Sequence, residues 1–336
     1  MNSQNLLMDV KDLRIFFFTD EGVVKAVNGV NMQIYRGRTL CLVGESGCGK
    51  SVACRAFLNI IRSPGRIVTG EMKYYRQTNG SMADVVDIAK LDPRGKQIRQ
   101  IRGKEISMIF QEPMTSLSMM HTIGDQIIET ILLHNKVTKA EARKRAIEML
   151  DRVGMPKPDR IVDEYPFRLS GGMRQRAMIA MALSCNPSLL IADEPTTALD
   201  VTTQAQIVDL IRDLQKQFNM SVLYITHDLG VVAEVADDVA VMYLGKIVEF
   251  GDVEIIFHHP KHPYTQALLR SIPKISRERE ELDPIQGMVP SPFRRPTGCQ
   301  FHPRCTQAME KCRQIEPRIT QVGENHAVQC LLYETL

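Results

Sequence analysis

Apolar and polar residues alternate along the first part of the chain in a way that predicts strands. Between residues 6 and 34 this alternation runs on both sides of a turn at residues 20–22, which predicts an antiparallel sheet. A mostly apolar run at Thr39–Val43 follows and is typical of a strand buried on both faces. A helix is expected next, to about residue 61, and then two short strands at residues 67–75 and 84–88.

The apolar period becomes helical in the middle of the chain. From about residue 123 to residue 153 apolar residues recur at spacings of three and four. Thr138, followed three residues later by Glu141, predicts the start of a helix that ends near Gly154. Further strands are expected at residues 106–110, 188–192 and 221–225, and a further helix at residues 203–218.

These elements predict an α/β fold made of a large domain and a small extension. The mostly helical block at about residues 112–178 interrupts a strand-rich core, so we expect it to be an inserted subdomain. The large domain is expected at residues 1–252. Residues 253–336 form an extension that is rich in proline and charge.

Composition narrows the possible classes of protein. The 336 residues are 44% hydrophobic and 24% charged, which is typical of a globular protein. The net charge of +3 is small, and the most basic run, residues 94–104, has no aromatic residue to stack on bases, so we expect no nucleic-acid partner. No stretch of about twenty apolar residues is present, and the first residues lack the apolar core of a signal peptide, so we expect a cytoplasmic chain.

Residues 44–51 fit the GxxxxGKS pattern of a phosphate-binding loop, between a predicted strand and a predicted helix. Its glycines let backbone amides approach phosphates, and the helix N-terminus points at the anion. Lys50 would reach the β- and γ-phosphates, and the Ser51 hydroxyl would be a ligand of Mg²⁺. The residues of this loop are Gly44, Glu45, Ser46, Gly47, Cys48, Gly49, Lys50 and Ser51.

Polar side chains follow three of the predicted strands. Asp193 and Glu194 come directly after the strand at residues 188–192, where open α/β sheets bind their ligands. Asp193 would bind Mg²⁺, and Glu194 would polarise an attacking water. Gln111 and His227 also follow strands, and a His in such a place is structural or functional. We expect these strand ends to meet at one edge of the sheet.

A second glycine-bearing helix start lies at residues 169–172. Ser170 would cap this helix, and Gly171 and Gly172 leave its first amides bare. Two interpretations are open from these residues: a second anion site, or a plain helix start without a ligand.

Taken in order, these motifs resemble the ATP-binding cassette (ABC) subunits of transporters over about residues 6–250. The sequence LSGG at residues 169–172 and the pair Asp193–Glu194 are the most specific of them. The resemblance implies a P-loop NTPase fold of the ABC type, with an antiparallel β subdomain, an inserted helical subdomain and a small cysteine-containing C-terminal extension. It also implies that two subunits enclose two nucleotides. Each nucleotide would lie between one subunit's phosphate loop and the partner's Ser170, Gly171, Gly172 and Asp200.

The resemblance also implies a role for each site residue. The phosphate loop would hold ATP, and Ser51, Gln111 and Asp193 would arrange Mg²⁺. Glu194 would be the catalytic base, and His227 would contact the γ-phosphate. Phe17 best matches the aromatic residue that stacks on adenine, with its neighbours Phe16 and Phe18 as alternatives. We expect two of these three phenylalanines to lie in the core.

Three further stretches, at residues 110–117, 192–206 and 262–269, resemble the dipeptide and oligopeptide importers of this family. This narrower resemblance implies a similar but distinct second ATPase subunit, two membrane permease subunits, and an extracellular or periplasmic solute-binding protein. The chain would lie peripherally at the cytoplasmic face of the cell (inner) membrane. Two alternatives have a different function: a non-transport ABC ATPase that acts on nucleic acid or the ribosome, and a redox-responsive iron–sulfur module.

The eight cysteines fall into two groups of four. Cys41, Cys48, Cys54 and Cys185 lie in or beside predicted core elements and are expected to be small buried hydrophobic residues. The second group is Cys299, Cys305, Cys312 and Cys330. Four thiols in a short segment of a cytoplasmic protein favour a metal over disulfides, and zinc, an iron–sulfur cluster or bare thiols are the alternatives. The family resemblance favours a [4Fe-4S] cluster.

Overall fold

The computed structural model describes residues 5–78, 81–111, 116–197, 199–272 and 285–334. The chain divides into two compact units, one formed by residues 1–90 and 226–336 and the other by residues 91–225. In the described part of the chain, no helix has the length and apolar character that a membrane crossing needs.

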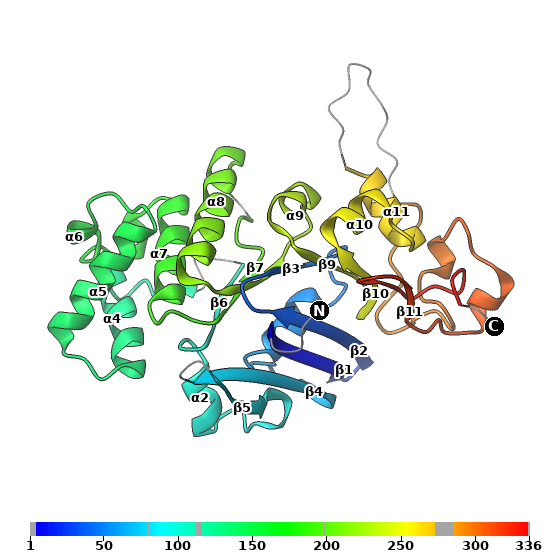
Figure 1. Cartoon of the computed structure of the whole chain (residues 1–336), viewed down its shortest axis with the longest axis horizontal. Coiled ribbons are helices and arrows are strands. Elements are labelled where there is room, and N and C mark those ends of the chain that lie inside the picture. Colours follow the sequence, from blue (N-terminus) through cyan, green and yellow to red (C-terminus); the bar gives the residue numbers. More distant parts are fainter. Residues whose placement is uncertain (1–4, 79–80, 112–115, 198, 273–284, 335–336) are drawn as a thin grey trace, which may run out of the picture. The chain divides into compact units, whose positions relative to one another are not determined.

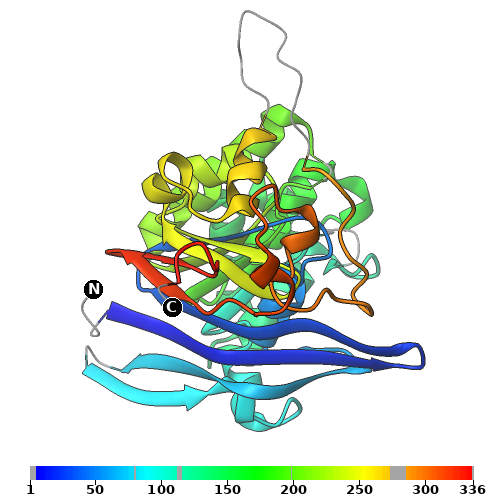
Figure 2. The same ribbon diagram turned by 90° about the vertical axis from the view of Figure 1, so that its right-hand side faces the viewer.

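A four-stranded antiparallel sheet opens the first unit. It contains β1 (Leu6–Thr19), β2 (Gly22–Tyr35), β4 (Gly65–Thr78) and β5 (Ser81–Asp87), in the order β2-β1-β4-β5. Figure 2 shows these long strands (blue to cyan) running side by side. The predicted antiparallel sheet is therefore confirmed. β4 is longer than expected because its backbone pairing with β1 and β5 continues through polar positions that give no apolar signal.

The expectation for the three phenylalanines at the end of β1 was wrong. Phe16 and Phe17 are only half-buried, and Phe18 is 40% exposed. Leu13 and Ile15, which alternate along β1, are completely buried, but the side chains are no longer buried toward the tip of the β1–β2 hairpin. At this tip the Arg66 guanidinium lies 4.3 Å from the centre of the Phe18 ring.

A second set of strands in the first unit ends at the buried β3 (Thr39–Val43). The order is β11-β12-β10-β9-β3, and β3 runs parallel to β9. The partners are β9 (Asp238–Tyr243), β10 (Lys246–Asp252), β11 (Thr320–Gly323) and β12 (His326–Val328). The helices of this unit are α1 (Lys50–Ala56), η2 (Ile88–Lys90), α9 (Leu229–Val235), α10 (Val253–His258), α11 (Pro263–Arg270), η4 (His302–Arg304) and η5 (Glu310–Arg313). α1 ends earlier than expected, before Asn59, whose backbone is left-handed.

The C-terminal extension packs onto this part of the first unit. β12 pairs with β10, as the neighbouring red and yellow strands in Figure 2 show. The buried carboxylate of Glu249 in β10 accepts hydrogen bonds from the backbone N–H groups of Lys261 and His262, at 2.6 and 3.0 Å, and lies 2.8 Å from His326 Nε2. A carboxylate that is completely buried needs such partners.

Three buried parallel strands form the centre of the second unit. They are β6 (Ile106–Ile109), β7 (Leu189–Asp193) and β8 (Ser221–Ile225), in the order β8-β7-β6. The helices of this unit are α2 (Lys96–Ile101), α4 (Ile123–His134), α5 (Lys139–Arg152), α6 (Pro158–Ile161), η3 (Pro166–Arg168), α7 (Gly171–Leu183) and α8 (Val201–Phe218), mostly green in Figure 1. Thr138 caps α5 as predicted, because its side chain accepts a hydrogen bond from the Glu141 N–H at 3.2 Å.

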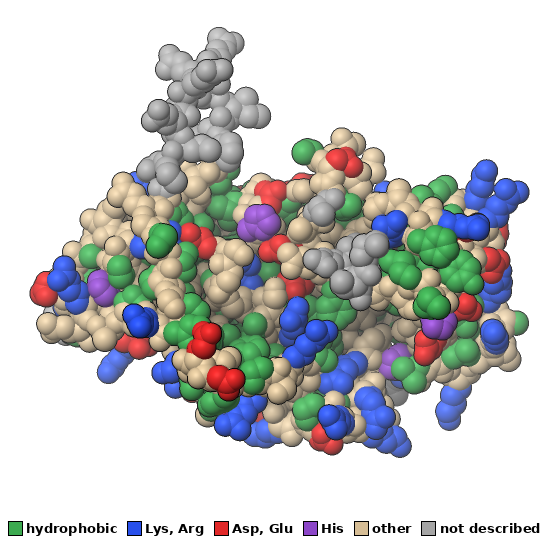
Figure 3. Space-filling model, turned by 180° about the vertical axis from the view of Figure 1, so that it is seen from behind, with side chains coloured by type: hydrophobic (Ala, Val, Ile, Leu, Met, Phe, Trp, Pro, Cys, Tyr) green, Lys and Arg blue, Asp and Glu red, His purple; other side chains and the backbone are tan. Residues whose placement is uncertain are grey.

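The basic run at residues 94–104 contains α2. This helix buries Ile98 and Ile101 and leaves Lys96 and Arg99 exposed. On the face seen in Figure 3, Lys and Arg side chains are interspersed with acidic and apolar ones. The basic run is therefore the solvated face of an amphipathic helix.

Candidate nucleotide-binding site

The phosphate loop connects β3 to α1 in the first unit, as predicted. Gly44, Gly47 and Gly49 have φ values of 148°, 77° and 108°, which L-residues rarely adopt. A Cβ atom on Gly44 would collide with the carbonyl oxygen of Met242, and one on Gly49 with that of Ala26. Glycine is therefore required at both positions, where the loop lies against β9 and β2.

Lys50 holds the loop together from within. Its side chain is buried, and its ammonium group donates hydrogen bonds to the carbonyl oxygens of Gly44 and Glu45, at 2.6 and 3.0 Å. Ser46 and Gly47 are exposed at the tip of the loop, and Ser51 is half-buried at the start of α1. The positive charge thus lies inside a glycine-rich loop whose tip is exposed, and such loops bind phosphate.

Cys48, like Lys50, has a buried side chain. It is 3% exposed, and burial raises the pKa of its thiol. Its Sγ lies 3.8 Å from Lys50 Nζ, inside the loop. Only the backbone of Cys48, and not its side chain, is therefore placed to contact a nucleotide. Cys41 and Cys54 are completely buried as expected, whereas Cys185 is only partly buried.

Two residues of the C-terminal extension contact Glu45, and the sequence did not reveal either of them. The Tyr264 hydroxyl in α11 accepts a hydrogen bond from the Glu45 backbone N–H at 2.9 Å. The guanidinium of Arg304 binds both carboxylate oxygens of Glu45, at 2.6 and 2.9 Å. Both residues are more than 200 positions from the loop in the sequence, and no local pattern connects them with it.

In the second unit, the carboxylates at the end of β7 lie where the sequence predicts them. Asp193 is the last residue of β7 and is 1% exposed. Glu194 has a left-handed backbone, with φ of 47°, and its N–H donates to the carbonyl oxygen of Ile225 at 2.9 Å. This conformation turns the chain at the strand end, so that Glu194 leaves the buried strand half-exposed.

The Glu194 carboxylate is held by two other side chains. Its Oε2 accepts hydrogen bonds from Gln111 Nε2 at 3.0 Å and from Thr197 Oγ1 at 3.1 Å. The structure therefore brings Gln111 and Glu194 together, in agreement with the expectation that strand ends meet at one edge of the sheet. Thr197 was missed, although its place three residues after the carboxylate is a spacing at which a hydroxyl reaches back in a turn.

The two proposed contacts with a partner's nucleotide both lie at helix starts in the second unit. Ser170 caps α7, since its Oγ accepts from the Met173 N–H at 3.3 Å, and Gly171 and Gly172 begin the helix. Asp200 caps α8 through Thr203, which donates its N–H at 2.9 Å and its hydroxyl at 2.7 Å. The Thr203 backbone hydrogen bond holds the pKa of Asp200 below its usual value.

The remaining predicted residues lie in the first unit. His227 is exposed directly after β8, and Asp228 beside it caps α9. The Phe17 ring lies against Gly65, where even one added methyl group would collide with it. Residues 112–115 and Ala198, which belong to two of the family-like stretches, lie outside the described residues.

The four cysteines of the extension lie near one another. Cys299, Cys312 and Cys330 are buried, and Cys305 is half-buried. Burial, followed by the neighbouring thiols, raises the pKa of Cys330 to about 11. Four cysteines are the type of donor set that zinc or an iron–sulfur cluster takes, although a raised thiol pKa favours the neutral thiol over the thiolate that binds metal. Within the ranges that the structure describes, however, no three His, Cys, Asp or Glu side chains are arranged to hold a metal ion.

Comparisons with known proteins agree with this geometry. A family model described as "ABC transporter" matches residues 27–197. The chain belongs to the ABC transporter family. A second model, "Oligopeptide/dipeptide transporter, C-terminal region", matches residues 248–312. As a member of this family the protein is an ATPase, with ATP and Mg²⁺ at its active site.

Similar proteins cover nearly the whole chain. The "Oligopeptide transport ATP-binding protein AppD" of Bacillus subtilis is 49% identical over 98% of this chain and 97% of its own. The "Dipeptide transport ATP-binding protein DppD" of Haemophilus influenzae is 47% identical over 96% of this chain and 94% of its own. Among solved structures, the dimeric "Bacterial ABC Transporter Cassette" MJ0796 has a TM-score of 0.63 and 26% identity, covering 74% of this chain and 99% of that one. The predicted fold class is thus confirmed.

Proposed function

We propose that this ATPase drives the import of dipeptides or oligopeptides. The observation that carries the proposal is the match of residues 248–312, most of which lie in the C-terminal extension, to the C-terminal region of oligopeptide and dipeptide transporters. The names of the near full-length relatives support the same solute class. Peptide selection would then belong to other subunits, since the described site is built for a nucleotide.

The proposal includes a set of partners. The similarity of this chain to the ATP-binding subunits of peptide importers implies that it works with membrane permease subunits. We further propose that there are two permease subunits, that a related but distinct ATPase completes a heterodimer, and that an extracellular or periplasmic binding protein delivers the solute. The chain would be peripheral, at the cytoplasmic face of the membrane.

We also propose a division of labour within the catalytic site. Lys50 and the amides of the phosphate loop hold the phosphates, and Ser51, Gln111 and Asp193 arrange Mg²⁺. Glu194 is the base for the attacking water, supported by its fixed carboxylate, and His227 contacts the γ-phosphate. Ser170, Gly171, Gly172 and Asp200 contact the partner's nucleotide, and Phe17 stacks on adenine.

The proposed domain division places the ATP-binding domain at residues 1–252, with its helical subdomain at about 112–178, and the extension at 253–336. The extension's four cysteines are proposed to hold a [4Fe-4S] cluster that braces it. The test is optical absorption of anaerobically purified protein combined with iron and zinc analysis. Zinc without iron, or no metal at all, would contradict the cluster.

Peptide import is tested by deleting the gene in the source organism and measuring uptake of labelled dipeptides and longer peptides. We expect uptake to fall to background and to return with the wild-type gene, but not with Glu194→Gln. Normal peptide uptake in the deletion strain, with loss of uptake of another solute, would show that the ATPase serves a different importer.

A further inference from the structure

The contact between the C-terminal extension and the phosphate loop is not explained by the proposed function. We propose that Arg304 is a positioning residue for ATP binding: through Glu45 it fixes the conformation of the phosphate loop. The extension would thereby set the affinity of the chain for ATP, in addition to any role it has in the importer.

The ion pair between Arg304 and Glu45 has the geometry of a strong interaction. Both terminal nitrogens of Arg304 contact the carboxylate, and the Arg304 side chain is only 3% exposed. Arg304 also donates within the extension, from Nε to the Gln286 carbonyl at 3.1 Å and from a terminal nitrogen to the Ile285 carbonyl at 3.5 Å. A bidentate pair in a buried setting is directional and costly to break from one side only.

Glu45 is held at three points, and each holds a different part of the residue. Arg304 binds its side chain, the Tyr264 hydroxyl binds its backbone N–H, and Lys50 Nζ binds its carbonyl oxygen. Lys50 is also the residue expected to meet the phosphates. Because Glu45 directly precedes the exposed tip of the loop, fixing it limits the directions in which the following amides can point.

The other end of the contact is anchored as well. Arg304 lies in the short turn η4, where its N–H donates to the Phe301 carbonyl at 3.0 Å. The Phe301 ring packs against two tyrosine rings. Its centre lies 5.2 Å from that of Tyr243 and 5.3 Å from that of Tyr264. Arg304 and Tyr264 therefore approach Glu45 from one packed aromatic cluster, rather than as independent surface contacts.

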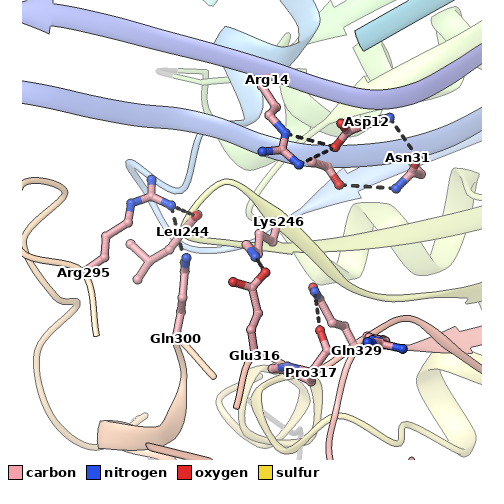
Figure 4. Close-up of polar contacts among 12 residues, drawn as sticks. Asp12, Arg14, Asn31, Leu244, Lys246, Arg295, Gln300, Glu316, Pro317 and Gln329 are labelled. Atoms are coloured by element: carbon pink, nitrogen blue, oxygen red, sulfur yellow. Dashed lines mark hydrogen bonds and ion pairs between the residues drawn. The ribbon is translucent and has the colours of Figure 1, made fainter. Parts of the chain in front are cut away.

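A purely structural interpretation is that Arg304 only attaches the extension to the rest of its unit. Other contacts already do this without touching the loop. Figure 4 shows two of them: Glu316 pairs with Lys246 of β10, and Arg295 donates to the Leu244 carbonyl at 2.6 Å. Glu316→Gln is thus a matched control, because it removes an ion pair of the extension and leaves Glu45 untouched.

The experiment measures binding of Mg²⁺ and a fluorescent ATP analogue to the full chain, together with hydrogen exchange of the amides at residues 44–51. We expect Arg304→Gln to weaken binding about tenfold and to speed exchange of the loop amides. Glu316→Gln should change neither quantity. Arg304→Lys, which keeps the charge but not the bidentate geometry, should recover part of the affinity.

A double mutant separates action through Glu45 from general destabilisation. If Arg304 acts through Glu45, combining Arg304→Gln with Glu45→Gln weakens binding no more than either change alone. Additive losses, an equal loss in Glu316→Gln, or unchanged affinity despite a lower unfolding midpoint would each overturn the proposal. If Arg304→Gln does not fold, Glu45→Gln decides: unchanged affinity and loop exchange in that variant would also overturn it.

Discussion

At the scale of single residues, the best-defined group of the catalytic site is the Glu194 carboxylate. Its left-handed backbone turns it out of β7, and Gln111 and Thr197 both donate hydrogen bonds to the same oxygen, Oε2. A carboxylate held in this way keeps its orientation without relying on water. This fixed orientation supports our proposal that Glu194 is the base for the attacking water.

We predict that Glu194→Gln binds ATP normally but hydrolyses it at least about a hundredfold more slowly, because glutamine cannot accept the proton. Single-turnover hydrolysis and equilibrium ATP binding measure the two effects separately. Thr197→Val is the companion variant: it keeps the carboxylate and removes one hydrogen bond, so its loss in rate should be much smaller. Near-normal turnover by Glu194→Gln would remove Glu194 as the base.

Sequence motifs identified the candidate site residues that belong to a motif themselves. They did not identify residues that contact the site from distant parts of the chain. Gln111 directly follows a predicted strand, and the family resemblance gave it a role in the nucleotide site; the structure places its Nε2 3.0 Å from Glu194 Oε2. Arg304 could not be found in this way, because its partner Glu45 lies 259 positions away and the segment between them has no periodic pattern that fixes its path. Contacts of this kind follow from tertiary packing alone.

At the scale of elements, α11 shows how a histidine can be structural. His262 is its N-cap: Nδ1 accepts a hydrogen bond from the Tyr264 N–H at 3.0 Å, so this nitrogen must be unprotonated. Burial lowers the pKa of His262 to about 3, against an opposing contribution from the Gln329 backbone. Capping by His262 also orders the turn that carries Tyr264 to the phosphate loop.

We predict that the chain loses stability on acidification because of His262. Below about pH 6.5 the unfolded chain takes up a proton at this site, while the folded chain stays neutral down to about pH 3. The free energy of unfolding should therefore fall between these values by up to about 1.4 kcal/mol per pH unit from this group.

Urea unfolding at pH 7, 6 and 5 measures this slope. His262→Asn keeps a capping acceptor that does not titrate, so it should flatten the slope. His258→Asn, at a side chain that is 70% exposed, should leave it unchanged. A slope that is the same in both variants would contradict the role of His262.

The strand and helix positions were largely predictable because their signals are local. β3 and β8 match their predicted bounds, and α5 begins at its predicted cap. The three phenylalanines of β1 were not predictable, because alternation identifies which side chains share a face but not how far along the strand that face is covered.

At the scale of the whole molecule, the two glycine-bearing helix starts are expected to serve different nucleotides. The loop of residues 44–51 would hold the chain's own ATP, and Ser170 with its neighbouring amides would face the partner's. An isolated chain should then bind ATP but hydrolyse it poorly.

In the absence of the proposed partner ATPase, two copies of this chain would supply both halves of the composite site. We therefore predict that the specific ATPase activity of the purified chain rises with its concentration. Mixing two inactive variants tests this directly. Lys50→Ala and Ser170→Arg should regain activity together, since one composite site in the mixed dimer contains an intact Lys50 and an intact Ser170. Absence of any recovery, with both variants folded and able to associate, would show that the two residues do not complement each other between chains.

The pairing of β12 with β10 has a consequence for any attempt to shorten this protein. β12 occupies the outer edge of β10 through Glu249 and Phe250. Cutting the chain after residue 252 would uncover a row of unpaired backbone groups, and Glu249 would lose the three groups that surround its carboxylate. Exposed strand edges recruit other strands. The shortened cassette would tend to aggregate. By covering the edge of β10, the extension would therefore also prevent self-association along that edge.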